Sequence, residues 1–168
     1  MQTRRLTRLA MLAVIALTIF IIELRIPNPF PIPGVKLGLA NIVTVYAVYR
    51  CRAGETLLIL LTRILLGALF AGNIMSLLYS MAGGMLCFVG MLFLRRGIPE
   101  RRMVLASIAG AVLHNLGQIA AAVLITRTPQ VLLYFPILLL TGCLAGTFTG
   151  LCVQAAARTG YWGHGSGI

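Results

Sequence analysis

Apolar residues fill six runs along this chain, and the short segments between the runs carry most of the charged residues. A helix of about 20 mainly apolar residues is long enough to cross the hydrocarbon core of a bilayer. The pattern therefore predicts an all-α integral membrane protein, built as a bundle of six transmembrane helices. The expected spans are Leu6–Ile26, Leu37–Tyr49, Thr56–Ala71, Met75–Leu94, Met103–Ile125 and Val131–Ala157.

The second and third runs are short for a membrane span. As a helix, Leu37–Tyr49 would rise only about 20 Å, which is less than the thickness of the hydrocarbon core. Either these helices extend into Val35 and Arg50–Arg52, or they lie partly shielded inside the bundle. We expect residues 1–158 to form a single membrane domain and residues 159–168 to form a short cytoplasmic tail.

Composition supports the membrane class. Of 168 residues, 60% are hydrophobic and only 10% are charged, and the mean hydropathy is +0.98. A soluble domain usually has about 25% charged residues. The first run follows Arg4 and Arg5 as a signal peptide would, but it contains Glu23 and has no small-residue cleavage site, so we expect a mature span.

The net charge of +11 arises from basic residues clustered beside the apolar runs. This placement is typical of residues that orient membrane helices, and it does not suggest nucleic-acid binding. With the N-terminus in the cytoplasm, only Arg25, Lys36 and Arg127 fall on the outer side. Both termini are therefore predicted to be cytoplasmic. The inner side then holds Arg4, Arg5, Arg8, Arg50, Arg52, Arg95, Arg96, Arg101, Arg102 and Arg158.

A proline-rich connector joins the first two runs, on the predicted outer side. Proline fixes φ, removes a backbone donor and biases the preceding residue toward extended geometry, so this segment cannot continue a helix. Proline also lowers the entropy that a loop loses on being fixed. We interpret the connector as a preorganised lid, with a rigid turn that only spaces two helices as the alternative. The lid residues are Pro27, Asn28, Pro29, Pro31, Pro33 and Gly34.

Polar residues concentrate in the outer half of the predicted bundle. Polar groups inside membrane spans are costly, and each one is a candidate for function. Their distribution predicts a pocket that opens to the outside and is closed toward the cytoplasm. The candidate substrate-binding residues are Glu23, Lys36, Asn41, Arg63, Asn73, Tyr79, His114, Asn115 and Gln118.

Each of these residues also has a structural interpretation. Arg63 could form an ion pair with Glu23, or it could be left for an anionic ligand if Arg25 or Lys36 takes that carboxylate. His114 could be a hydrogen-bonded core histidine. Asn41 and Asn115 could cap or bridge helices.

Small residues recur at helical spacing in two spans. Gly142, Gly146 and Gly150 form two overlapping GxxxG units, which allow a neighbouring helix to approach closely. Ala10, Ala13 and Ala16 form a stripe on the first span, and we consider it the best candidate for docking a partner subunit. For both stripes, packing within the chain is the favoured explanation and docking to another membrane subunit is the alternative. The four cysteines have no metal-binding spacing.

The scarcity of acidic residues excludes several functions. The chain has three glutamates and no aspartate, so it lacks the clustered carboxylates that hold magnesium in phosphoryl or prenyl transferases. It has no GxxxxGK[ST] motif for nucleotide hydrolysis. We expect no catalytic activity, no metal site and no cofactor.

Four ordered motifs resemble one known family. They are ExRIPNPFPIPGVKLGLAN (23–41), TRILLGALFAGN (62–73), YSMAGG (79–84) and HNLGQ (114–118). These motifs are similar to those of the Gx transporter family, whose members are often labelled heptaprenyl diphosphate synthase component I. The resemblance extends over Leu6 to Ala157.

That family is similar in size and layout to the S components of energy-coupling-factor (ECF) transporters. The resemblance implies a bacterial cell (inner) membrane protein that captures a small, partly anionic, vitamin- or precursor-like solute from outside. It also implies import powered by partner ATPases, with docking to a T component through the first helix. The alanines here are three residues apart, whereas S components show AxxxA. The alternative function is an accessory membrane subunit of isoprenoid or quinone synthesis, or of flavin-linked electron transfer; a self-sufficient oligomeric carrier is a third possibility.

Overall fold

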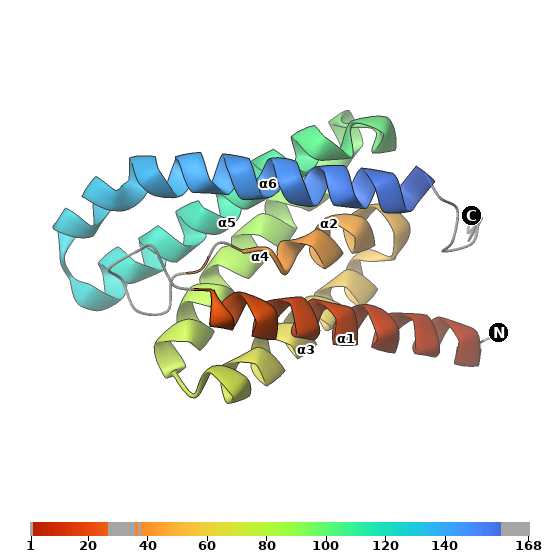
Figure 1. Cartoon of the computed structure of the whole chain (residues 1–168), viewed down its shortest axis with the longest axis horizontal. Helices are drawn as coiled ribbons and strands as arrows, with labels where there is room; N and C mark the ends of the chain where they lie inside the picture. The colour runs from red at the N-terminus through yellow and green to blue at the C-terminus, as the bar shows by residue number, and fades with distance from the viewer. Residues whose placement is uncertain (1, 27–35, 37, 159–168) are drawn as a thin grey trace.

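The computed structural model describes residues 2–26, 36 and 38–158, and every regular element in this part of the chain is helical (Figure 1). The proposed lid, residues 27–34, and the expected tail, residues 159–168, lie outside the described residues. Six α-helices and two short 3-10 helices follow one another along the sequence. They are α1 (Gln2–Arg25), α2 (Asn41–Arg50), α3 (Ala53–Ala71), α4 (Ile74–Gly97), η1 (Glu100–Arg102), α5 (Met103–Thr126), η2 (Pro129–Tyr134) and α6 (Phe135–Arg158).

Five of the six α-helices are long and apolar enough to cross a membrane: α1, α3, α4, α5 and α6. The exception is α2, whose 10 residues rise only about 15 Å. Seven of its residues, including Val43 and Tyr46, are buried against other helices. Of the two expectations for the short second run, shielding inside the bundle is therefore the correct one. The third run is longer than expected, because α3 begins at Ala53 and not at Thr56.

The other five helices surround α2. In Figure 1, α1 and α6 lie on opposite sides of it, while α4 passes behind it and α5 passes behind α6. α1 packs mainly on α3, and α5 packs mainly on α4 and α6. The start of α1 and the end of α6 lie at the same end of the molecule (Figure 1). A core of α2 residues with Leu60, Ile64 and Met91 holds these layers together.

The glycine stripe of α6 packs against α5, as the GxxxG spacing predicts. A Cβ atom on Gly146 would lie 2.8 Å from the Cα of Ile108, and one on Gly150 would lie 2.7 Å from the Cα of Val104. On Gly142 it would lie 2.4 Å from Asn115 Nδ2. These separations are below van der Waals contact, so only glycine permits this approach of the two helices.

The alanine stripe of α1 divides between the surface and the core. Ala10 is exposed and Ala13 is partly buried, whereas Ala16 is 1% exposed and belongs to the main core. Ala16 therefore packs within the chain. A partner could contact Ala10 directly, and docking through the stripe stays a prediction.

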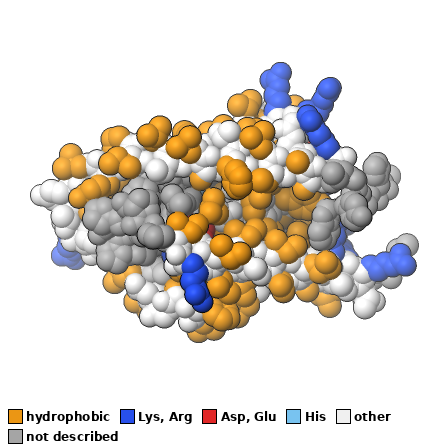
Figure 2. Space-filling view, viewed as in Figure 1, with side chains coloured by type: hydrophobic (Ala, Val, Ile, Leu, Met, Phe, Trp, Pro, Cys, Tyr) orange, Lys and Arg blue, Asp and Glu red, His pale blue; other side chains and the backbone are white. Residues whose placement is uncertain are grey.

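Two ion pairs lie at the end of the molecule where α1 begins. Arg5 pairs with Glu55 at the start of α3, and Arg50 at the end of α2 pairs with Glu100. The pair on Glu55 joins the start of α1 to the start of α3. Figure 2 shows Lys and Arg side chains concentrated toward this end, as expected if it is the cytoplasmic end.

Candidate functional site

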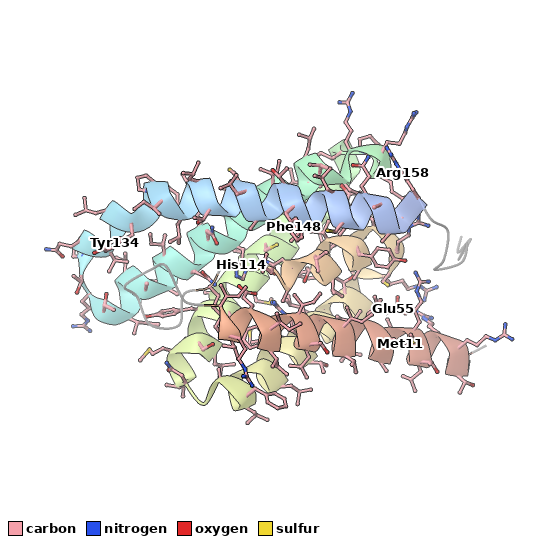
Figure 3. All side chains as sticks on the ribbon, viewed as in Figure 1. Met11, Glu55, His114, Tyr134, Phe148 and Arg158 are labelled. Atoms are coloured by element: carbon pink, nitrogen blue, oxygen red, sulfur yellow. The ribbon has the colours of Figure 1, made fainter. Side chains whose placement is uncertain are left out.

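Buried polar side chains from five helices meet in the half of the molecule away from the ion pairs. Glu23 comes from α1, Asn41 from α2 and Arg63 from α3. α4 contributes Ser76 and Ser80, and α5 contributes His114 and Gln118; all seven are at most 5% exposed. Figure 3 shows His114 in the interior, distant from the end that carries Glu55 and Arg158. We call these seven residues and Lys36 the polar cluster.

The Glu23 carboxylate binds the backbone of the segment that leads into α2. It accepts hydrogen bonds from the Gly38 N–H at 2.6 Å and the Ala40 N–H at 3.4 Å. Gly38 has φ +80°, a left-handed conformation that favours glycine and turns its N–H toward α1. Among the described residues, Glu23 forms no ion pair. Glu23 therefore holds the segment that follows the proline-rich connector, at Gly38 and Ala40, against the end of α1.

Removing this carboxylate should release the segment. We expect Glu23→Ala to lower the hydrogen-exchange protection of the Gly38 and Ala40 amides by roughly tenfold or more, because a hydrogen bond to a charged acceptor contributes about 1.5–3 kcal/mol. Hydrogen exchange of the purified protein with fragment-level mass spectrometry measures this. Amides in the middle of α5 serve as the internal control. Unchanged protection at Gly38 and Ala40 would contradict the anchoring role.

Lys36 reaches from the connector into the cluster. Its Nζ donates to Ser76 Oγ at 2.5 Å and lies 3.9 Å from the centre of the Phe20 ring, a cation–π contact. Burial lowers the pKa of the Lys36 ammonium to about 8; Glu23 opposes this shift and Arg63 adds to it. The side chain is therefore mostly cationic at neutral pH.

Arg63 is a buried cation of the cluster with unpaired nitrogen atoms. It is 3% exposed, and its Nε and Nη2 atoms are buried without a hydrogen-bond partner among the described residues. Glu23 attracts it, but the two form no ion pair in the described part of the chain. A buried guanidinium without partners is costly, so this group calls for an anion or another acceptor.

Asn41 is also buried without partners. Neither its Oδ1 nor its Nδ2 has a hydrogen bond within the described part of the structure. It lies beside Gly38, where a Cβ atom would come 3.0 Å from Asn41 Nδ2 and 3.0 Å from His114 Cδ2. His114 is satisfied on one side, since its Nε2 lies 2.9 Å from Gln118 Nε2. Gln118 Oε1 also accepts the Lys36 N–H at 3.4 Å.

Three of the predicted site residues lie elsewhere. Asn73 is exposed, and its side chain caps α4 by accepting the Met75 N–H. Asn115 turns toward α6 and donates from Nδ2 to the Leu138 carbonyl at 2.6 Å, which is the bridging role that the sequence left open. Tyr79 packs in an apolar cluster with Leu138 and others between α4, α5 and α6.

The list of candidate substrate-binding residues did not include four residues that the structure places in or around the cluster. Ser76 and Ser80 lie on α4, Phe20 stacks under Lys36, and Gly38 supplies the N–H for Glu23. Two signals were present in the sequence. Phe20 precedes Glu23 by three residues and so shares its helix face, and the spacing of four places Ser76 and Ser80 on one face of α4.

Two buried polar residues nearer the other end of the bundle satisfy each other. Ser107 Oγ of α5 and Thr149 Oγ1 of α6 share a hydrogen bond of 2.8 Å. Among the described residues, five of the seven buried side-chain atoms without a hydrogen-bond partner belong to Arg63, Asn41 and His114 of the polar cluster. The other two are Arg8 Nε and Asn115 Oδ1. Two cationic groups and free amide atoms together suit a ligand with a negative charge and polar edges.

Comparison with known proteins gives one match. The sequence model of a family described as heptaprenyl diphosphate synthase component I matches residues 12–156. The matched range includes every member of the polar cluster. No curated protein and no solved structure matches the chain.

Proposed function

This chain belongs to the heptaprenyl diphosphate synthase component I family, and from that premise we propose that it is a solute-binding membrane subunit. It captures a small, partly anionic molecule from the outer side of a bacterial cell membrane, in the manner of an ECF S component. The observation that carries the proposal is the buried Arg63 guanidinium, whose Nε and Nη2 atoms have no acceptor among the described residues. A bound anion would supply the acceptors.

The other members of the polar cluster fit the same role. Lys36 brings a second cation to the site, and Asn41 offers a free amide donor and acceptor. Glu23 fixes Gly38 and Ala40, so the residues that follow the proline-rich connector are held directly over the cluster. In this proposal the connector serves as the lid over the solute, and its prolines limit the entropy lost on closure.

The order of the helices supports six crossings and two cytoplasmic termini. α1 and α3 both begin at one end of the molecule, joined there by the Arg5–Glu55 ion pair. Since α1 ends at the opposite end, the chain must return across the bundle before α3 begins, and α2 makes most of this return. The concentration of arginine at the shared end supports a cytoplasmic location for both termini.

We propose that the chain itself catalyses no prenyl transfer, although the family description includes the word synthase. Its three acidic residues lie apart and are engaged: Glu23 with backbone amides, Glu55 with Arg5 and Glu100 with Arg50. Prenyl chain elongation needs carboxylates that converge on magnesium. Energy for import would come from separate ATPases, bound through a T component near the exposed Ala10 face of α1.

Identification of what co-purifies tests the function. The protein should be expressed in a bacterial membrane, solubilised gently and analysed by native mass spectrometry, followed by extraction and identification of bound small molecules. We expect one small anionic solute per chain, and recovery of T-component and ATPase subunits from native membranes.

Other results would point to other functions. Recovery of only a prenyl synthase or a redox subunit, with no bound solute, would contradict solute capture and favour an accessory subunit. Uptake by the purified protein in liposomes without ATPases would instead show a self-sufficient carrier, and would contradict the need for partner ATPases.

A further inference from the structure

A cleft lies at the opposite end of the molecule from the polar cluster. Its volume is about 810 Å³, and it lies where the end of α2, the η1 turn and the end of α6 come together. Figure 3 labels one of its residues, Arg158, at the end of α6. The lining residues are Arg50, Pro99, Glu100, Arg101, Arg102, Gln154, Ala157 and Arg158.

The cleft has an excess of positive charge. Arg50 is neutralised by its ion pair with Glu100, which is the only acidic residue among the lining residues. The side chains of Arg101, Arg102 and Arg158 form no ion pair within the described part of the chain. Three guanidinium groups around one hollow raise the local potential and favour a multivalent anion.

The walls of the cleft are held in place independently of these charges. Gln154 Nε2 of α6 donates to the Arg101 carbonyl of η1 at 2.9 Å, which ties the two arginine-bearing walls together. The Arg50–Glu100 pair ties the end of α2 to the same turn. Orientation in the membrane requires only that arginines lie on the inner side. It does not require them to surround a fixed cleft.

Exposed apolar side chains continue from the cleft along the membrane-facing surface. Leu151 of α6 precedes Arg158 by seven residues, so it shares a helix face with an arginine of the cleft. Leu105 lies in the first turn of α5, three residues after Arg102 of η1. Leu105 is 53% exposed and Leu151 is 57% exposed. A phosphate group in the cleft could therefore carry acyl or prenyl chains along α5 and α6.

We propose that this cleft is a binding site for the phosphate group of an anionic molecule at the cytoplasmic membrane surface. Arg101, Arg102 and Arg158 contact the phosphate oxygens, for which the planar guanidinium group is well suited. The two possible sources of such a group are a membrane lipid headgroup and a soluble phosphate or diphosphate. The site is separate from the polar cluster and does not depend on the proposed solute-binding function.

Two probes distinguish the sources, and a matched pair of variants tests the site. Native mass spectrometry in neutral detergent measures retention of phosphatidylglycerol against phosphatidylcholine, and equilibrium dialysis measures binding of radiolabelled inorganic diphosphate. The test variant is Arg101→Gln/Arg158→Gln. The control is Arg4→Gln/Arg96→Gln, which removes the same charge from two exposed arginines that do not line the cleft.

We expect the test variant to weaken binding of the retained probe by roughly 25-fold, since one basic residue near an anionic surface contributes about a fivefold factor. The control should weaken it by less than about threefold. Retention of phosphatidylglycerol would identify a lipid source, and binding of diphosphate alone would identify a soluble one. Failure to bind either probe, or equal losses in the two variants, would overturn the site and leave the arginines as determinants of orientation.

Discussion

Replacing Arg63 by methionine is expected to weaken solute binding by roughly 100-fold or more while leaving the empty protein folded. The guanidinium is buried with two nitrogen atoms unpaired, and each charge-assisted hydrogen bond to an anionic solute should contribute about 1.5–3 kcal/mol. Methionine has a similar length and removes a buried charge that lacks partners. Such a change is often neutral or stabilising to the free protein.

Solute recovered per chain and the thermal unfolding temperature of solute-free protein together test this prediction. Arg25→Met is the matched control, because Arg25 is exposed at the end of α1, two residues after Glu23. It should leave both quantities unchanged. Normal solute recovery in Arg63→Met would contradict the anion site. Failure of the variant to fold, with Arg25→Met intact, would instead assign Arg63 a structural role beside Glu23.

The second large effect is expected at the contact of α5 and α6. Gly146→Leu should destabilise the protein by roughly 3 kcal/mol or more, at the upper end of overpacking penalties. Its Cβ atom would lie 2.8 Å from the Ile108 Cα and 3.1 Å from the Ser107 carbonyl oxygen, and backbone atoms cannot move aside without separating the helices. Thermal unfolding and recovery of monodisperse protein in detergent measure the loss.

Gly54→Leu provides the comparison, because a Cβ atom on Gly54 meets nothing within 4 Å. The same side chain is added to a helix in both variants, and replacing glycine favours the helix in each, so a loss seen only at Gly146 reports the α5–α6 contact. We expect the Gly54 variant to unfold at or near the temperature of the unmodified protein. Equal unfolding temperatures for the two variants would show that α6 does not depend on close packing against α5.

The amino-acid sequence by itself determined the class of protein, the helical architecture and the close contact of α6 with its neighbour. These features depend on local properties: the length of an apolar run, the three- and four-residue spacing of small side chains, and the clustering of arginine beside the apolar runs. The same local reasoning identified the general region of the polar cluster, because polar residues inside spans are rare and easily located. It also recognised the family that the comparison then gave.

Only the tertiary structure decided which polar residues meet. Spacing along one helix cannot show whether Asn115 faces α4 or α6. It also cannot show that Tyr79 packs among apolar side chains. Both contacts depend on how each helix is rotated against its neighbours. The partner of Glu23 was equally hidden. It is the backbone of Gly38 and Ala40, and a backbone N–H carries no sequence signal that singles it out. Arg63 is therefore left without that carboxylate as a hydrogen-bonded partner, a result that depends on three-dimensional packing.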